Sequence, residues 1–519
     1  MHDTAGVSLA EKRPARLSWW AVALVLAAIG LTVLWPGDVP WQTDEPRLLA
    51  QAWHGNHEHI LIPAGQYGNF GVPYGPLPIW IYQGLLLFSH DPIALVFWRS
   101  LLCASATGFA LLWLGRTLRL PQWFAAAILV TPYITAFHRI LWDASFDIPL
   151  GAFAVAAFAD FCTTRRRWPL RLCLACTALL PVIHPQALPL SGAIGLYLLW
   201  QKRAELWEDG RALGIVGAVL LAFHAAYIPR AIGAILWRFS HGAPTVYPGQ
   251  GSRLISALAP FLGGHLLDGT AYAENVVTPS AKTFPWVHIA EWLSHSIYVL
   301  LWLGIGLAAW RTWTLLRRST NMAEWSPRDE LSVVLAGCVV LQMLLFVALR
   351  IPPGAQYFFG VFAAQAALAW LAVDLSRWRP VGLALGSAFG LGSFYLTHTT
   401  NLMCNYRGYN SADWLRLDHC VAVARYLNQF SDATAETDVI FLQRSPQTLR
   451  TLRLLIPPQP NEPQKQSPGL LITEDVPINF DGLALDVFQR GQGIPLSPNS
   501  KTIDITPLPK DWVPDPSTW

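Results

Sequence analysis

Residues 19–35 read WWAVALVLAAIGLTVLW, and residues 41–47, shortly after them, read WQTDEPR. The first stretch carries no charge and approaches the ~20 apolar residues that a helix needs to cross a bilayer. The second places Asp44 and Glu45 side by side just beyond it. Adjacent carboxylates at a membrane boundary cost desolvation energy, so they are usually solvated or functional. A carboxylate that takes a proton from an attacking hydroxyl suits such a half-enclosed place, and we expect this pair to be catalytic.

The composition of the chain is typical of a membrane protein. Of its 519 residues, 53% are hydrophobic and only 13% are charged. A soluble globular chain carries about 25% charged residues. The 25 Trp residues suit a protein with many membrane–water boundaries. We therefore expect an α-helical polytopic membrane protein, and no pattern in the sequence is typical of nucleic-acid binding.

Hydropathy divides the chain into about eleven membrane spans and a polar tail. The expected spans are 19–35, 93–115, 121–137, 147–163, 169–183, 187–201, 212–230, 290–310, 330–349, 355–375 and 381–397. The first is expected to be an uncleaved span, because no small-residue cleavage site follows it. Residues 77–90 are apolar but too short for a span, which favours an interfacial or re-entrant helix.

Arginine and lysine occur in alternate connections between these spans. They cluster at 12–16, 116–119, 165–171, 202–211, 311–318 and 377–379. Positively charged connections face the cytoplasm, so the N-terminus is expected to be cytoplasmic in a bacterial inner membrane. The extracytoplasmic connections are then 36–92, 138–146, 184–186, 231–289 and 350–354.

The predicted domains are a transmembrane catalytic domain at 1–397, with large external loops at 36–92 and 231–289, and an extracytoplasmic tail at 398–519. The tail is polar and rich in proline, and we expect it to form a small α/β domain. A helix at 411–430 and strands at 438–443 and 470–473 are its predicted elements. Cys404 and Cys420 could form a disulfide there if the tail is extracytoplasmic.

The acidic pair opens a segment with helical periodicity. Leu48 and Ala52 give it an apolar face, which places Asp44 and Glu45 at the helix N-terminus. Anionic side chains are favoured there by the helix dipole. Simple helix capping is therefore the alternative to a catalytic role.

The loop after this helix is rich in histidine and aromatic residues. His57 and His59 flank Glu58 and could bind zinc, but three ligands without a fourth are a weak signal. An ordinary polar loop is the alternative, and we expect no required metal or other cofactor. Tyr74 and Trp80 are suited to the membrane interface, and Tyr74 is a candidate substrate-supporting residue.

A second external site is predicted at His138–Asp147. Arg139 and Asp143 are four residues apart, so on a helix they could pair on one face. Two acids and an arginine at the start of a span are costly unless they line a polar cavity. His138, Asp143 and Asp147 are candidate supporting residues, and the alternative for Arg139 and Asp143 is a structural ion pair.

Two later hydrophobic hairpins are also interrupted at their outer ends. His184-Pro-Gln186 interrupts one, and Arg350-Ile-Pro-Pro-Gly-Ala-Gln-Tyr357 interrupts the other. Arg350 could grip a phosphate through its guanidinium, and Tyr357 is a candidate supporting residue. The alternative for Arg350 is a side chain that reaches from a helix end to the interface.

At these residues the chain resembles the GT-C superfamily of integral-membrane glycosyltransferases, in the branch of protein O-mannosyltransferases and lipid A aminoarabinose transferases. The similar elements are Thr43-Asp-Glu45, Gly75-Pro-Leu-Pro-Ile-Trp80, Arg99 in an apolar run, Arg139–Leu150 with Trp142-Asp-Ala-Ser145, and Gln356-Tyr357. The resemblance covers residues 15–200 well and the rest by hydropathy. One element differs: the aminoarabinose branch has a lysine where Tyr74-Gly75 stands here.

The resemblance implies a polyprenyl-phosphate sugar as donor and an extracytoplasmic lipid, glycan or protein acceptor. The expected reaction is an inverting displacement with Asp44 as general base, Glu45 as its aid, and Arg139 and Arg350 on the leaving phosphate. A transporter or flippase of a lipid-linked or anionic substrate is the rival interpretation. A scaffold with a degenerate site is a third, because the lysine is missing.

Overall fold

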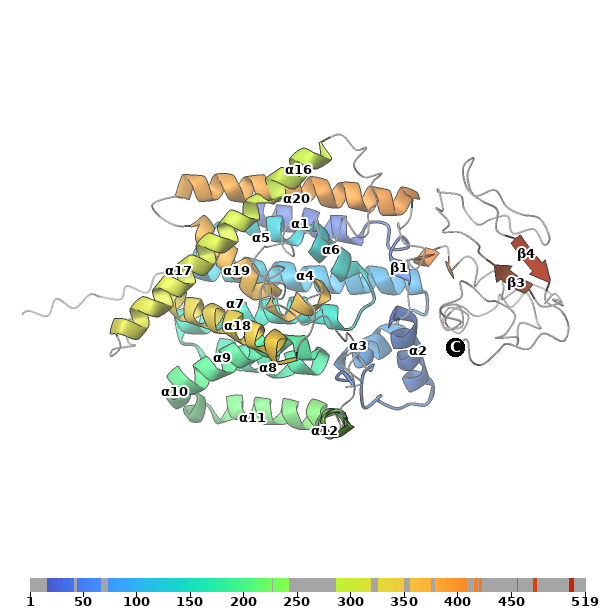
Figure 1. Cartoon of the computed structure of the whole chain (residues 1–519), viewed down its shortest axis with the longest axis horizontal. Coiled ribbons are helices and arrows are strands. Elements are labelled where there is room, and N and C mark those ends of the chain that lie inside the picture. The colour runs from blue at the N-terminus through green and yellow to red at the C-terminus, as the bar shows by residue number, and fades with distance from the viewer. Residues whose placement is uncertain are drawn as a thin grey trace, which may run out of the picture.

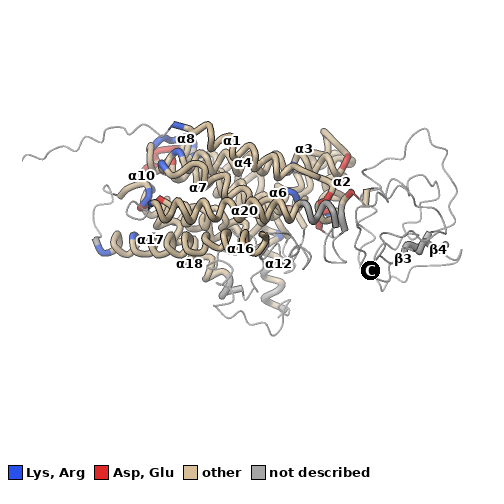
Figure 2. Tube along the Cα trace, turned by 90° about the horizontal axis from the view of Figure 1, so that it is seen from above, with Lys and Arg blue, Asp and Glu red and all other residues tan. Residues whose placement is uncertain are grey.

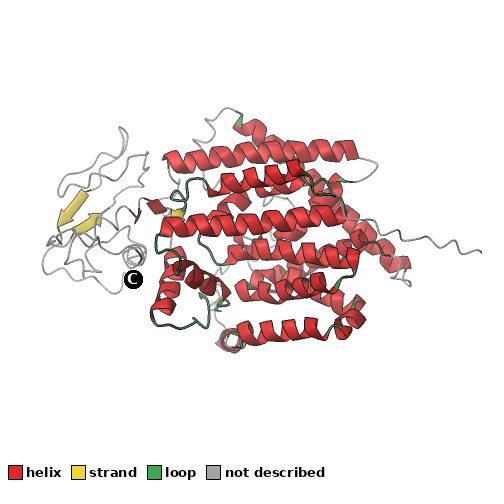
Figure 3. Ribbon diagram, turned by 180° about the vertical axis from the view of Figure 1, so that it is seen from behind, coloured by secondary structure: helices red, strands yellow, loops and turns green. Residues whose placement is uncertain are grey.

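The structure is a computed structural model in which helices account for nearly all of the regular secondary structure (Figures 1 and 3). It describes residues 16–41, 44–66, 73–225, 227–241, 286–318, 325–349, 355–374, 379–407, 415–418, 420–421, 455, 470–473 and 504–507. The first half contains α1 (Trp19–Val33), β1 (Pro40–Trp41), α2 (Asp44–His57), α3 (Leu77–Leu86), α4 (Pro92–Leu118), α5 (Phe124–Leu129), α6 (Pro132–Arg139), η1 (Ala144–Phe146), α7 (Asp147–Thr164), α8 (Arg167–Ile183), η2 (Pro185–Ala187), α9 (Leu188–Gln201), α10 (Arg203–Glu208), α11 (Gly210–Val219), η3 (Leu220–His224) and α12 (Ile228–His241). The second half contains α16 (Val287–Ser294), α17 (Ser296–Arg318), α18 (Pro327–Leu349), η6 (Ala355–Val361), α19 (Phe362–Val373), α20 (Arg379–Arg407), β2 (Leu415–Arg416), β3 (Leu470–Thr473) and β4 (Asp504–Pro507).

Four helical segments of the described chain are long and apolar enough to cross a membrane. They are Pro92–Leu118, Ala144–Thr164, Val287–Arg317 and Arg379–Asn401. Shorter apolar helices include Trp19–Val33, Leu77–Leu86 and Phe358–Val373. The helical membrane class is thus confirmed, whereas the number of eleven spans stays a prediction. A helix is present at 77–86, as expected for the short apolar stretch.

Several predicted spans are interrupted helices. The span expected at 121–137 is divided into α5 and α6, because Thr131 caps α6 by accepting a hydrogen bond from the Ile134 N–H and Pro132 occupies the first helical position. The span expected at 355–375 begins as the 3-10 helix η6 before α19. The span expected at 212–230 is likewise divided, with the π-helical turn η3 after α11.

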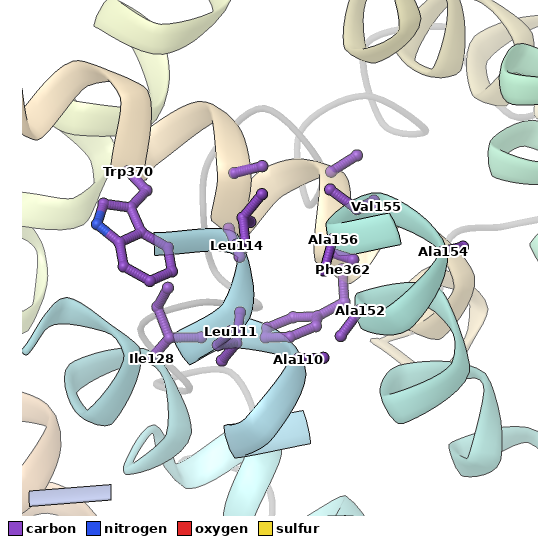
Figure 4. Packing of buried hydrophobic residues seen from close by; sticks show 14 of the residues in the cluster. Ala110, Leu111, Leu114, Ile128, Ala152, Ala154, Val155, Ala156, Phe362 and Trp370 are labelled. Carbon is purple, nitrogen blue, oxygen red and sulfur yellow. The ribbon is translucent and has the colours of Figure 1, made fainter. Parts of the chain in front are cut away.

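The core of the bundle forms where α4, α5, α7 and α19 meet. Leu111, Ile128, Val155 and Phe362 are buried there together with Trp370 (Figure 4). Runs of alanine on α7 let its neighbours approach closely, as small residues do at helix contacts in membranes. The contact of α17 with α19 also requires a small residue, because a Cβ at Gly304 would lie 2.1 Å from the Leu368 carbonyl oxygen.

Lys and Arg residues gather at one end of the bundle, around α8, α10 and the C-terminal end of α17 (Figure 2). Buried Glu330 pairs there with Arg165 and, at 3.3 Å, with Lys202. Arg171 pairs with Asp209 at 2.9 Å in the same region. The acidic residues of α2 lie at the opposite end of the long helices (Figures 1 and 2).

A short strand pair joins the start of the tail to the segment before α2. Pro40 is opposite Arg416 and Trp41 is opposite Leu415 in antiparallel register. The helix predicted at 411–430 is wrong at Leu415–Arg416, which form strand β2, whereas the described residues 417–418 and 420–421 are helical. The strand predicted at 470–473 is confirmed and pairs with β4, whereas 438–443 lies outside the described residues.

The tail residues next to β2 are packed into a second hydrophobic cluster. Leu417, Cys420 and Val421 are buried there with Trp41 and Leu48. Cys420 is a free, buried thiol, which argues against the disulfide suggested for it. The acidic helix α2 is thus supported by residues from both ends of the chain.

Candidate active site

The position of Asp44 is set by its place at the start of α2. Leu48, Leu49 and Ala52 are completely buried and hold one face of this helix in the second hydrophobic cluster, against α3 among other elements. The first turn is fixed further by Gln66, whose Nε2 donates to the Asp44 carbonyl oxygen at 2.9 Å. Asp44 itself is half-buried, and Glu45 beside it is buried.

Burial and two neighbouring side chains determine the electrostatics of Asp44. Burial raises the pKa of its carboxyl above the ordinary 3.8, which makes the carboxylate a better proton acceptor. The Arg47 guanidinium, on the same helix, and the Trp142 indole N–H, acting as a hydrogen-bond donor, lower that pKa in part. Because burial is the largest of these effects, the Asp44 carboxylate is a stronger base than an exposed aspartate.

Asp143 brings a second carboxylate close to the first. One of its oxygens accepts from the Ala144 backbone N–H at 2.6 Å, and the residue is buried. Burial raises the pKa of Asp143 to about 7, and the charge of Asp44 adds to this increase. The negative charge of Asp44 thus disfavours the charged form of Asp143, as expected for a nearby like charge.

Arg139 is bound differently from the prediction. Its guanidinium pairs with buried Asp38 and donates to Asn401 Oδ1 at 2.9 Å and to the carbonyl oxygens of Leu34 and Trp35 at 3.1 and 2.8 Å. The predicted pairing with Asp143 is therefore replaced by an ion pair with Asp38. The physical reason is that α6 ends at Arg139 and the chain is extended at Ile140, so helical spacing does not continue.

A chain of polar contacts runs behind the two carboxylates. The Tyr74 and His184 rings are 4.1 Å apart, and His184 Nδ1 accepts from the Gln186 N–H at 3.2 Å. Gln186 Nε2 in turn donates to Asp147 at 3.4 Å, and Asp147 is completely buried. Tyr74, Asp147 and the His184-Pro-Gln186 segment, predicted separately, thus lie along one connected region.

The remaining predicted residues lie in several places. His138 is completely buried and its Nε2 contacts the Thr107 hydroxyl at 3.1 Å. Arg350 and the side chain of Tyr357 lie outside the described residues. The His57 ring stacks on Trp53 with centroids 5.1 Å apart. Within the described ranges, no group of three or more His, Cys, Asp and Glu side chains could hold a metal ion.

Four contributors to this region had no assigned role in the sequence analysis, although all lie in stretches quoted or discussed there. Trp142 and Arg47 act on Asp44, Asp38 binds Arg139, and Arg99 holds the segment that carries Trp142. Arg99 carried the clearest signal, because a charged residue in the interior of an apolar helix is costly. Asp38 carried little signal, since a polar residue in a short Pro-Gly segment is ordinary.

Comparison with known proteins adds one related sequence. No protein-family model matches the chain. It is 25% identical over 304 residues to the undecaprenyl phosphate-alpha-4-amino-4-deoxy-L-arabinose arabinosyl transferase of Pseudomonas paraeruginosa (strain DSM 24068 / PA7), covering 56% of this chain and 46% of the relative. The chain thus spans about half the length of that relative. This match agrees with the family resemblance noted from the sequence.

Two solved structures are similar in outline. ArnT from Cupriavidus metallidurans in the apo state has a TM-score of 0.48 and 13% sequence identity, covering 89% of this chain and 87% of that chain. The same protein bound to undecaprenyl phosphate has a TM-score of 0.44 and 13% identity, covering 84% of each chain.

Proposed function

We propose that this protein is a membrane glycosyltransferase that moves a sugar from a polyprenyl-phosphate-linked donor to a hydroxyl or amine acceptor outside the cytoplasm. The observation that carries the proposal is the half-buried Asp44 at the start of α2, which acts electrostatically on buried Asp143 and has exposed Arg47 on the same helix. The sequence similarity to an undecaprenyl-phosphate-dependent arabinosyl transferase supports the same class of donor.

The proposed reaction is one displacement at the anomeric carbon. The acceptor oxygen or nitrogen attacks this carbon, the carbon–oxygen bond to the phosphate breaks, and the electron pair leaves with the lipid phosphate. Asp44 takes the proton of the acceptor, and the configuration inverts. Arg47 is exposed and close to Asp44, so it is suited to meet the phosphate, where negative charge develops in the transition state.

Roles for the other residues follow from their contacts. Asp143 aids Asp44 by orienting the acceptor. Arg139 is already paired with Asp38, and a direct contact with the donor phosphate stays a prediction for Arg139 as well as for Arg350. No step requires a metal ion, because arginine can neutralise the leaving phosphate.

The proposed orientation follows from the charge distribution. The basic clusters around α8 and α10 face the cytoplasm by the positive-inside rule, and the end with α2 faces outward (Figure 2). The N-terminus would then be cytoplasmic and the tail extracytoplasmic, in the inner membrane of a bacterium. Cysteine labelling from either side of the membrane tests this orientation.

The deciding experiment measures transfer of radiolabelled sugar from a panel of polyprenyl-phosphate sugars in membranes. We expect a labelled product with the wild type and a loss of at least about 10²-fold in kcat with Asp44→Asn, as for removal of a general base. Asp91→Asn is the matched control, because Asp91 is an exposed helix cap and asparagine also caps well. Full activity of Asp44→Asn would overturn the base assignment, and movement of the donor across the bilayer without transfer would favour a flippase.

A further inference from the structure

Arg99 is a buried cation whose described partners are all neutral. It lies in α4 within a membrane-spanning stretch and is completely buried. Its Nη1 donates to the Phe137 carbonyl oxygen at 2.8 Å, its Nη2 donates to the Ser145 hydroxyl, and its guanidinium lies 5.1 Å from the centre of the Phe146 ring. Among the described residues no carboxylate forms an ion pair with it. Burying an unpaired charge is costly, which indicates that the Arg99 guanidinium has a role that offsets this cost.

The two residues that Arg99 binds enclose the segment at the active site. Phe137 lies near the end of α6, and Ser145 lies in η1. Between them the chain turns through 139–144, which includes Trp142 and Asp143. One guanidinium therefore bridges both ends of this segment.

The contact with Ser145 continues to the backbone of the segment itself. The Ser145 hydroxyl accepts from Arg99 and donates to the Trp142 carbonyl oxygen at 2.8 Å. Trp142 in turn acts on the Asp44 carboxylate through its indole. A continuous series of contacts thus leads from α4 to the proposed base on α2.

We propose that Arg99 is a positioning residue for the transfer reaction, which acts by holding the 139–144 segment so that Trp142 and Asp143 face Asp44. This inference rests on the proposed function and adds a residue that touches neither donor nor acceptor. The planar guanidinium supplies two parallel donors in fixed directions, whereas a lysine ammonium is a flexible point charge. The bridge between two acceptors explains why arginine stands here.

The test compares three variants with a matched control. Arg99→Met removes the bridge, Arg99→Lys keeps the charge, and Ser145→Ala removes one acceptor. Ser100→Ala is the control, because Ser100 is the next residue on α4, is equally buried, and its hydroxyl has no hydrogen-bond partner among the described residues. We expect kcat to fall ~10–100-fold in Arg99→Met with KM for the donor within about twofold, since a small misplacement of a catalytic group acts on the chemical step.

Two further readouts separate positioning from general destabilisation. Combining Ser145→Ala with Trp142→Phe should lower kcat no more than the larger single change does, because both act through one contact series. Hydrogen–deuterium exchange of the wild type and variants should show faster exchange at 139–146 in Arg99→Lys, with α7 unchanged. The exchange measurement does not depend on transfer activity.

The outcomes distinguish the two proposals. Wild-type protein that transfers no sugar from any donor contradicts the proposed function, while exchange at 139–146 still tests the bridge. An active wild type with unchanged kcat in Arg99→Lys and Ser145→Ala overturns the positioning role. Equal hydrogen–deuterium exchange at 139–146 in the wild type and both Arg99 variants also overturns the positioning role. Additive losses of kcat in the double variant of Ser145→Ala and Trp142→Phe overturn it too.

Discussion

At the residue scale, the chemistry of Asp44 depends on two opposing effects. Burial raises the pKa of its carboxyl, and Arg47 and the Trp142 indole lower it. A general base works only when it is deprotonated, so kcat/KM should fall as the pH drops through the pKa of Asp44. Because burial is the largest effect, this acidic limb should lie above the ordinary aspartate value of 3.8.

Trp142→Phe should move the acidic limb to higher pH. The indole N–H stabilises the charged carboxylate, so its removal raises the pKa of Asp44 further and leaves a smaller fraction deprotonated at a given pH. We therefore expect the acidic limb of the kcat/KM profile to move measurably to higher pH, by no more than the contribution of one hydrogen bond. Trp98→Phe, an exposed tryptophan on α4, is the control and should leave the profile in place. A shift to lower pH would contradict the assignment of Asp44 as base.

The sequence predicts residues whose environment is local and misses those that depend on distant contacts. Asp44 is predicted because it stands beside Glu45 just beyond an apolar span, and the spacing of Leu48 and Ala52 places both acids at the start of a helix. Arg139 and Asp143 have helical spacing too, but the helix ends between them. The Asp38 side chain that binds Arg139 instead is 101 residues away in the chain, and no local pattern indicates such a contact.

At the element scale, the segment before α3 is packed directly against α8. A Cβ at Gly75 would lie 1.6 Å from the Val182 carbonyl oxygen and 2.5 Å from its carbonyl carbon. Since both are backbone atoms, no side chain can move aside to make room. The glycine is therefore required by this close approach, which also brings Tyr74 onto His184.

Gly75→Ala should separate this segment from α8 and disturb the site. We expect a loss of about 1–3 kcal/mol in stability from the overpacked contact, measured as a lower melting temperature in detergent, and reduced transfer activity. Gly84→Ala on α3 is the matched control, because nothing lies within 4 Å of the Cβ that alanine would add there, and alanine favours a helix interior by about 1 kcal/mol. If Gly75→Ala and Gly84→Ala had equal melting temperatures, α8 would have moved to accommodate the added methyl group. The glycine at position 75 would then not be required by the close approach.

Helix boundaries illustrate the same division between local and distant causes. The expected helices at 93–115, 147–163, 169–183 and 187–201 correspond to α4, α7, α8 and α9 within a few residues. Each has flanking Pro, Asp or Arg residues that are recognisable in the sequence. The break at Thr131 was missed because apolar residues continue on both sides of it, so hydropathy alone does not indicate the cap.

At the scale of the whole molecule, one buried ion pair ties three distant segments together. Asp38 follows α1, Arg139 ends α6, and Asn401 lies in α20, 262 residues after Arg139. Asp38 and Arg139 are both buried. Strand β1 follows Asp38 closely in sequence, and its pairing with β2 connects the start of the tail to the segment before α2. The position of the acidic helix therefore depends on contacts from the whole length of the chain.

Removing either partner of this ion pair should destabilise the fold. Asp38→Asn leaves Arg139 buried without its counter-charge, and the expected cost is about 3–5 kcal/mol. Arg139→Gln should cost a similar amount, and the double variant should cost less than the sum of the two, because neither charge is then left alone. Thermal unfolding in detergent measures all three variants, with Asp91→Asn as the control.

The same variants decide between two roles for Arg139. If Arg139 only stabilises the fold, Asp38→Asn and Arg139→Gln should lower transfer activity in proportion to the amount of folded protein that is lost. The KM for the donor should then be the same in both variants. If Arg139 also binds the donor phosphate, Arg139→Gln should raise KM for the donor well beyond the value for Asp38→Asn, since only Arg139→Gln removes a phosphate ligand. We expect the first result, because the guanidinium already binds a carboxylate, an amide oxygen and two carbonyl oxygens of the protein. A larger KM in Arg139→Gln alone would mean that these contacts open when donor binds.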